Sequence, residues 1–153
     1  MKDPIPKAAL QDPRLRVIFD SFNHLTGKDL IGCFDPLAMW NADRAIVAHG
    51  LEADPVFFYG NRMALQCFEM DFDAFVRLPS RLSAEPLARP LRARLLDEVT
   101  RRGYVDNYCG VRIASSGNRF TISDGTVWNL VDAMGVCHGQ AATFVIQPDQ
   151  PAP

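Results

Sequence analysis

Long hydrophobic runs are missing from this sequence of 153 residues. No apolar stretch approaches the roughly 18 residues that a membrane-spanning helix needs. Prolines and charges interrupt every apolar stretch of residues 1–11, so this segment lacks the apolar centre of a secretion signal. We therefore expect a soluble, cytoplasmic protein.

An excess of positive charge is also missing. The chain has 16 Lys and Arg residues against 18 Asp and Glu residues, and its formal net charge is -2. Such a chain has no global positive field to hold a nucleic acid or an anionic membrane surface. We expect neither as a partner.

Clustered cysteines and the common catalytic signatures are absent as well. The four cysteines stand singly in the chain, at Cys33, Cys67, Cys109 and Cys137. Without CxxC pairs they are predicted to be free thiols, although a zinc site formed by convergence with the histidines stays an alternative. No GxSxG, HExxH, GxGxxG or P-loop pattern occurs, so we assign no catalytic residue.

What the sequence does contain begins with an amphipathic helix over residues 12–26. Its apolar positions recur at steps of three and four, at Leu15, Ile18, Phe19, Phe22 and Leu25. Asp12 is suited to cap its start, and Gly27 is suited to end it in the left-handed conformation. Residues 1–11 before it are expected to be flexible.

Five β-rich segments follow, at 44–49, 56–59, 104–114, 119–130 and 136–146. Short turns after the first and between the last three predict hairpins and one antiparallel sheet. Between the second and third segments lie a helix capped by Asn61, a turn opened by Asp71 or Asp73, and a helix over 86–102 that ends at Gly103. The apolar stripe of the last helix recurs at steps of four, at Leu87, Leu91, Leu95 and Val99. This order predicts one α+β domain over 12–146, with helices inserted after the second strand and a disordered tail at 147–153.

The element order and a set of short motifs resemble a PAS domain, and more closely the MEKHLA domain, which occurs in free-standing bacterial proteins and in plant homeodomain leucine-zipper regulators. The motifs are Trp40-Asn41, His49-Gly50, Asp54-Pro55, Tyr59-Gly-Asn61, the segment 78–86, Gly110-Val-Arg112, Ser115-Ser-Gly117, Trp128-Asn-Leu130 and the segment 138–142. The resemblance implies a PAS-like sensory fold with a five-stranded antiparallel sheet. It implies no catalytic residues and names no ligand.

Light-sensing PAS relatives bond a cysteine covalently to flavin. In the nearest segment here, Ser80 stands where that cysteine would be, and a hydroxyl is a far weaker nucleophile than a thiolate. A covalent flavin adduct is therefore disfavoured. Non-covalent flavin and haem stay alternatives, and the cofactor is unknown.

Seven residues are candidates to line a ligand cavity between the sheet and the inserted helices: His49, Tyr59, Asn61, Arg81, Tyr108, Arg112 and Trp128. Each also has a structural interpretation. His49 can be a locally hydrogen-bonded histidine at a strand end, Asn61 a helix cap, and either arginine a member of a surface ion pair. Trp128 and Asn129 point to opposite faces of their strand, and the pattern does not decide which one faces the cavity.

The leading hypothesis is a sensory or regulatory domain that binds an unidentified small molecule and signals through a protein partner. The alternatives are a ligand-free protein-interaction module that uses the outer sheet face and the 12–25 helix, and an enzyme that uses the same cavity. A homodimer is also predicted, because Leu15, Phe19 and Phe22 must be buried either by the sheet of their own chain or by a second copy.

Overall fold

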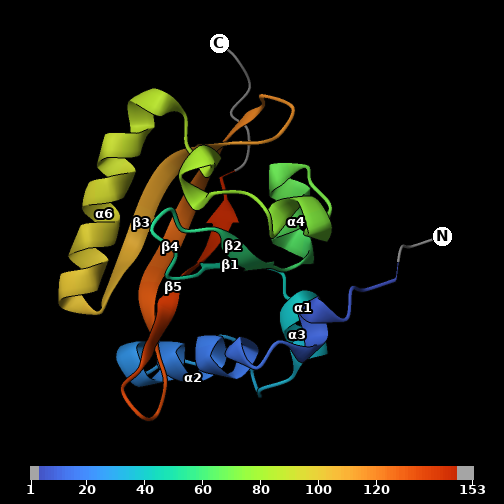
Figure 1. The fold of residues 1–153 in the computed structure, drawn as a ribbon, viewed down its shortest axis with the longest axis vertical. Coiled ribbons are helices and arrows are strands. Elements are labelled where there is room, and N and C mark those ends of the chain that lie inside the picture. The colour runs from blue at the N-terminus through green and yellow to red at the C-terminus, as the bar shows by residue number, and fades with distance from the viewer. Residues whose placement is uncertain (1–3, 148–153) are drawn as a thin grey trace.

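The computed structural model describes residues 4–147 and contains a five-stranded antiparallel sheet (Figure 1). The strands are β1 (Ala45–His49), β2 (Phe57–Gly60), β3 (Tyr104–Ile113), β4 (Arg119–Val131) and β5 (Cys137–Ile146). They are arranged in the order β2-β1-β5-β4-β3, and every neighbouring pair is antiparallel. The predicted sheet and its hairpins are confirmed.

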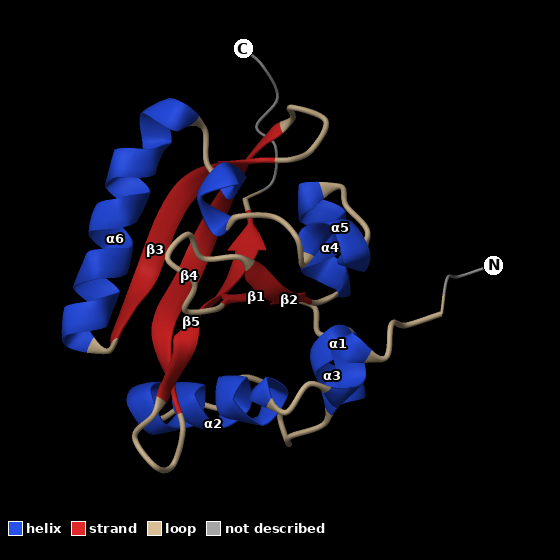
Figure 2. Ribbon diagram, viewed as in Figure 1, coloured by secondary structure: helices blue, strands red, loops and turns tan. Residues whose placement is uncertain are grey.

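Six α-helices surround the sheet (Figure 2). They are α1 (Ala8–Gln11), α2 (Arg14–Thr26), α3 (Pro36–Trp40), α4 (Arg62–Phe68), α5 (Phe72–Phe75) and α6 (Arg89–Arg102), and two 3₁₀ turns, Ser80–Ser83 and Pro86–Ala88, precede α6. Asp35, Asn61 and Asp71 cap α3, α4 and α5 through their side-chain oxygens. These acceptors satisfy backbone N–H groups that have no partner inside a helix, which is why each helix begins where it does.

Helices cover both faces of the sheet. Successive strand residues point to opposite sides, so Val47 packs in a cluster with residues of α4, whereas Ile46 packs in a cluster with residues of α2 and α3. In Figure 1, α6 runs along β3 at the left of the view, and α2 crosses the lower end of β4 and β5. We call the α4 and α6 side the inner face and the α2 side the outer face.

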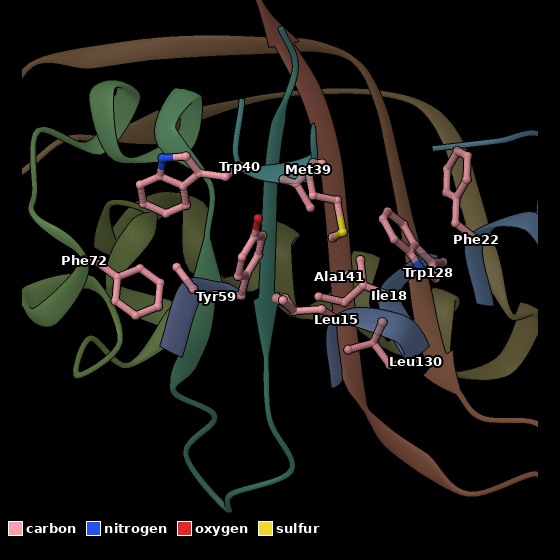
Figure 3. Close-up of a cluster of buried hydrophobic side chains, with 13 residues drawn as sticks. Leu15, Ile18, Phe22, Met39, Trp40, Tyr59, Phe72, Trp128, Leu130 and Ala141 are labelled. Atoms are coloured by element: carbon pink, nitrogen blue, oxygen red, sulfur yellow. The ribbon is translucent and has the colours of Figure 1, made fainter. Parts of the chain in front are cut away.

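The amphipathic helix α2 buries its apolar stripe against the outer face of its own chain. Leu15, Ile18 and Phe22 are buried there, and the Phe22 ring meets the Trp128 ring edge-on with centroids 4.9 Å apart (Figure 3). The Trp128 indole also donates a 3.0 Å hydrogen bond to Ser21 Oγ. Of the two ways to bury this stripe, the structure contains the one within the chain, which removes the basis for predicting a dimer through α2.

The ends of α2 follow the expected chemistry. Gly27 has φ 73° and its N–H bonds to the Asn23 carbonyl, as predicted for the residue after the helix. Asp12 does not occupy the N-cap position itself, which Pro13 takes, but its carboxylate accepts a 2.8 Å bond from the Arg14 N–H. The carboxylate therefore still binds an N–H group of the first turn.

The segment before α2 differs from the prediction. Residues 1–11 were expected to be flexible, yet from residue 4 onward they pack on the domain: α1 forms there, Ala9 is fully buried, and Ile5 and Leu10 contact the outer-face cluster. Small apolar contacts of this kind order a segment that is too short to form a helix alone. Of the predicted tail 147–153, residues 148–153 lie outside the described residues.

The stripe predicted for the helix at 86–102 is only half correct. Leu95 and Val99 are buried, but Leu91 is 67% exposed, and the α-helix begins at Arg89. A four-residue step advances about 40° beyond a full turn, so a stripe of such steps drifts around the helix. The buried face of α6 therefore includes positions that the stripe did not contain.

Within residues 4–147, no helix has both the length and the apolar character that are needed to cross a membrane.

Candidate functional site

A cavity of about 50 Å³ lies between the inner face of the sheet and the helices, and with its mouth the free space reaches about 510 Å³. Most of its wall is apolar. The lining residues are Val47, Ala48, His49, Phe57, Phe68, Ser83, Arg92, Leu95, Leu96, Tyr108, Arg112, Ile122, Val127, Gln140, Ala141, Ala142 and Phe144.

His49 brings an unpartnered nitrogen into this cavity. The side chain is 8% exposed, and its Nδ1 lies 3.1 Å from the Gly50 carbonyl oxygen. A carbonyl oxygen can only accept, so Nδ1 carries the proton. Nε2 is buried without a hydrogen-bond partner among the described residues.

Burial keeps His49 neutral. Loss of solvent is the largest effect, and it lowers the pKa of His49 below its usual value of 6.5. The Gly50 carbonyl and Glu52 raise this pKa, Arg92 lowers it, and Gln140 lies near the ring without meeting hydrogen-bond geometry at Nε2. In the neutral ring with its proton on Nδ1, Nε2 is an acceptor that needs a donor.

Arg92 places a second unsatisfied group at the cavity. Its side chain comes from α6, one turn before Leu95 and Leu96, and no carboxylate or carbonyl of the described residues pairs with it. Burial, followed by the positive charge of Arg112, lowers the pKa of Arg92 to about 10. A guanidinium that has lost water without gaining an anion raises the free energy of the fold.

Arg112 and Tyr108 form the third polar part of the wall, on β3. The Arg112 Nη2 donates a 3.1 Å bond to the Tyr108 hydroxyl, and Nη1 donates a 2.9 Å bond to the Val111 carbonyl. The guanidinium also lies over the Tyr108 ring, 5.6 Å from its centroid. These contacts fix the orientation of the guanidinium but leave its charge uncompensated.

Gln140 completes the polar lining next to His49. Its side-chain amide nitrogen lies 3.1 Å from each of three acceptors, the Leu96 carbonyl, the Thr100 hydroxyl and the Asn129 side-chain Oδ1, which share its two N–H groups. The bonds tie β5 to α6 and β4. They fix the wall of the cavity where His49 and α6 approach one another.

The charge of the cavity is one-sided. Its wall contains two guanidinium groups and, among the described residues, no carboxylate and no cysteine. In the same part of the chain, no three His, Cys, Asp or Glu side chains gather in a way that could hold a metal ion.

Three of the seven candidate residues, His49, Tyr108 and Arg112, do line the cavity. Their binding of a ligand stays a prediction. The other four candidates lie elsewhere.

Tyr59 and Trp128 belong to the outer-face core, as Figure 3 shows, and both are fully buried there. Trp128 faces α2, so its neighbour Asn129 takes the inner side, where its amide donates to the Val99 carbonyl of α6 at 3.0 Å. The Tyr59 hydroxyl has no partner among the described residues, and burial raises its pKa.

Arg81 lies at the surface and pairs with Asp54 at 3.1 Å, because its 3₁₀ turn directs it to solvent. Asn61 is fully buried and acts as a bridge. Its Oδ1 accepts from the Ile46 and Ala64 N–H groups, and its Nδ2 donates to the Met39 and Arg44 carbonyls. The predicted cap is thus confirmed, and Asn61 also joins α4 to α3 and to the start of β1.

Three polar lining residues were missed from the sequence, Ser83, Arg92 and Gln140. The signal for Arg92 was present: the positions 92, 95 and 99 follow helical steps of three and four, which place the arginine on the buried face of α6. For Gln140 the signal was alternation with Ala142 and Phe144 on β5, all of which reach the cavity.

The cavity is small for a flavin or a haem. An engineered cavity of about 150 Å³ binds one benzene ring, and the present cavity has about a third of that volume. Three fused rings do not fit without displacement of the wall.

Comparison with known proteins supports the fold. Residues 13–147 match the model of the MEKHLA domain. A light-oxygen-voltage domain studied with a flavin analogue shares 14% identity and a TM-score of 0.62, over 74% of this chain and 84% of that chain. A PAS domain from Colwellia psychrerythraea shares 12% identity and a TM-score of 0.61, over 72% and 92% of the two chains.

A third similar structure is the PAS domain of a LuxR-family transcriptional regulator from Burkholderia thailandensis, in complex with ethanol. It shares 13% identity and a TM-score of 0.58, over 74% of this chain and 97% of that chain. No curated protein matches the chain in sequence. The sheet order and the family match over nearly all of the chain lead to one conclusion: the chain belongs to the MEKHLA domain family and has a PAS-like fold.

Proposed function

We propose that this protein is a sensory domain that binds a small molecule in the inner-face cavity and passes the signal to a protein partner. The observation that carries the proposal is the unpartnered, buried Nε2 of His49 at the wall of an otherwise apolar cavity. Buried polar atoms in folded proteins nearly always have a partner. A bound molecule would supply the missing one.

The position of α6 suggests how binding is transmitted. This helix supplies Arg92, Leu95 and Leu96 to the cavity, while Ala93, Asp97 and Arg101 on its opposite side are exposed to solvent. A ligand that draws Arg92 inward would also shift the exposed side of the helix. A partner that contacts α6 would detect that change.

Native mass spectrometry of the freshly purified chain, together with an absorbance spectrum, tests the binding. We expect added mass that denaturation removes and that Ala142→Leu reduces by filling the cavity. Ala93→Leu is the matched control, because Ala93 is exposed on α6. A parent chain without added mass, whose cavity amide signals in NMR also fail to respond to small alcohols, would contradict the proposal.

The two alternative hypotheses have less support. The interaction module was to use the outer sheet face, but α2 of the same chain occupies it. An enzyme in the same cavity would have to use His49 and Arg92, whose pKa values are lowered, because no carboxylate lies among the lining residues that are described. Homodimerisation stays a prediction that light scattering tests, now without a role for the α2 stripe.

A further inference from the structure

The chemistry of the cavity restricts the class of ligand, provided that the cavity binds a small molecule as proposed above. Three polar features meet there: the guanidinium of Arg92, the guanidinium of Arg112 and the Nε2 of His49. Each has a defined requirement. The Arg92 guanidinium has lost solvent without gaining an anion, the charge of Arg112 has no counterion among the described residues, and the neutral imidazole needs a hydrogen-bond donor.

The arginines favour a carboxylate over a neutral polar group. Arg92 has no ion pair or hydrogen bond among the described residues, and Arg112 uses one N–H for Val111 and another for Tyr108, which leaves its charge without a counterion. The planar fork of a guanidinium matches the two oxygens of a carboxylate. A single negative charge near both would relieve the repulsion between them.

His49 requires something that a carboxylate alone does not provide. Its Nδ1 proton is used by the Gly50 carbonyl, so the lone pair of Nε2 lacks a donor in a residue that lines the cavity. A carboxylate oxygen facing that lone pair would be repelled. A hydroxyl group on the ligand would donate to it, as buried acceptors require.

The size and the polarity of the cavity restrict the ligand further. The wall between the polar groups is formed by side chains such as Phe57, Phe144 and Val127, so the body of the ligand is hydrocarbon. The enclosed part of the cavity holds only about 50 Å³, so even a molecule of a few carbons would extend into the open mouth. We infer that the ligand class is a short hydroxycarboxylate, with its carboxylate at Arg92 and Arg112 and its hydroxyl at His49.

Three molecules of similar size separate these contributions: 3-hydroxybutyrate has both groups, butyrate has only the carboxylate, and butane-1,3-diol has only hydroxyls. Their dissociation constants can be measured by NMR titration of the dialysed, ¹⁵N-labelled chain. We expect 3-hydroxybutyrate to bind about three- to tenfold more tightly than butyrate, for one neutral hydrogen bond, and at least about tenfold more tightly than the diol, for the charged contact. Lactate in the same series tests the position of the hydroxyl.

Two variants on α6 test the role of the charge. Arg92→Gln should weaken the preference for 3-hydroxybutyrate over the diol while the diol still binds, because only Arg112 is left to contact the carboxylate. Arg92→Lys should retain more of the preference. Arg94→Gln is the matched control, because Arg94 makes the same charge change at an exposed position of the same helix. A preference that Arg92→Gln leaves unchanged overturns the assignment of the carboxylate.

The role of His49 can be tested without a variant. In a long-range ¹H–¹⁵N spectrum, the Nε2 signal should move on addition of 3-hydroxybutyrate and should stay in place with butyrate. Equal binding of these two acids, or a proton found on Nε2 in the free protein, overturns the hydroxyl contact.

Failure of this inference is distinguishable from failure of the proposed function. If the diol binds as tightly as the acids, the hydroxycarboxylate class is wrong and the cavity still binds small molecules. If none of the three binds, the class is also wrong, and native mass spectrometry with Ala142→Leu decides separately whether the cavity binds anything.

Discussion

Replacement of Arg92 by Met should make the ligand-free protein more stable. Burial lowers the pKa of Arg92 to about 10, from an ordinary value above 12. At about 1.4 kcal/mol for each tenfold change in acidity, the charged guanidinium costs the fold about 3 kcal/mol at neutral pH. Arg92→Met removes that cost and keeps most of the aliphatic volume. After loss of the contacts of the longer side chain, a gain of about 1–2 kcal/mol is expected, in the range found when buried charges are replaced by apolar groups.

Urea unfolding followed by circular dichroism measures this gain. The midpoint should rise at an unchanged slope, and the melting temperature should rise by about 2–8 °C for a domain of this size. Arg94→Met at the exposed position of the same helix should change stability by less than about 0.5 kcal/mol. A loss of stability in Arg92→Met, or equal effects of the two substitutions, would refute the reasoning that Arg92 is held in the cavity at an energetic cost. Retention of such a cost is typical of binding sites.

Three further predictions follow from the same structure. Asn61→Ala should destabilise the fold by more than about 3 kcal/mol, because it leaves four buried backbone groups without their partner. Asn41→Ala at an exposed position is the control in the same urea assay. Similar unfolding midpoints for the two variants would contradict the bridging role of Asn61. Because burial lowers the pKa of His49 below 6.5, the unfolded chain binds a proton there that the folded chain does not. The free energy of unfolding should therefore fall as the pH decreases below about 6.5, by at most about 1.4 kcal/mol per pH unit, and His49→Gln should lack this component. Burial raises the pKa of Cys67 to about 11. A thiol reagent at pH 7.5 should therefore label Cys67 at least about tenfold more slowly than the exposed Cys33, Cys109 and Cys137. Equal labelling rates for all four cysteines would be inconsistent with the buried position of Cys67.

The elements that the sequence predicted correctly have local causes. Asn61 caps α4 and Gly27 ends α2 because backbone N–H groups and a left-handed residue have requirements that one side chain satisfies. The antiparallel pairing of the last three strands follows from connections too short for any other arrangement. Such features depend on a few neighbouring residues, so the sequence alone determined them.

The cavity depends on residues far apart in the chain, and for that reason only part of it was predicted. His49 was identified at the end of its strand, but its free Nε2 arises because the Gly50 carbonyl takes the Nδ1 proton and no other donor approaches. Arg92 was overlooked because the apolar stripe assigned to α6 used steps of four residues. Such a stripe drifts around the helix, so it did not identify the side of α6 that faces the sheet.

Patterns in the amino-acid chain were enough to predict the α+β order, the strand pairing, the helix ends and the family of this protein. Tertiary structure decided which face of each strand met which helix: alternation places Trp128 and Asn129 on opposite sides, but only the docking of α2 on the outer face assigned the tryptophan to that core. It also decided that Arg92 and Arg112, from a helix and a strand, share one cavity without a carboxylate. Whether a charged side chain has a counterion depends on residues that are close in space but far apart in the chain, so no local sequence pattern predicts it.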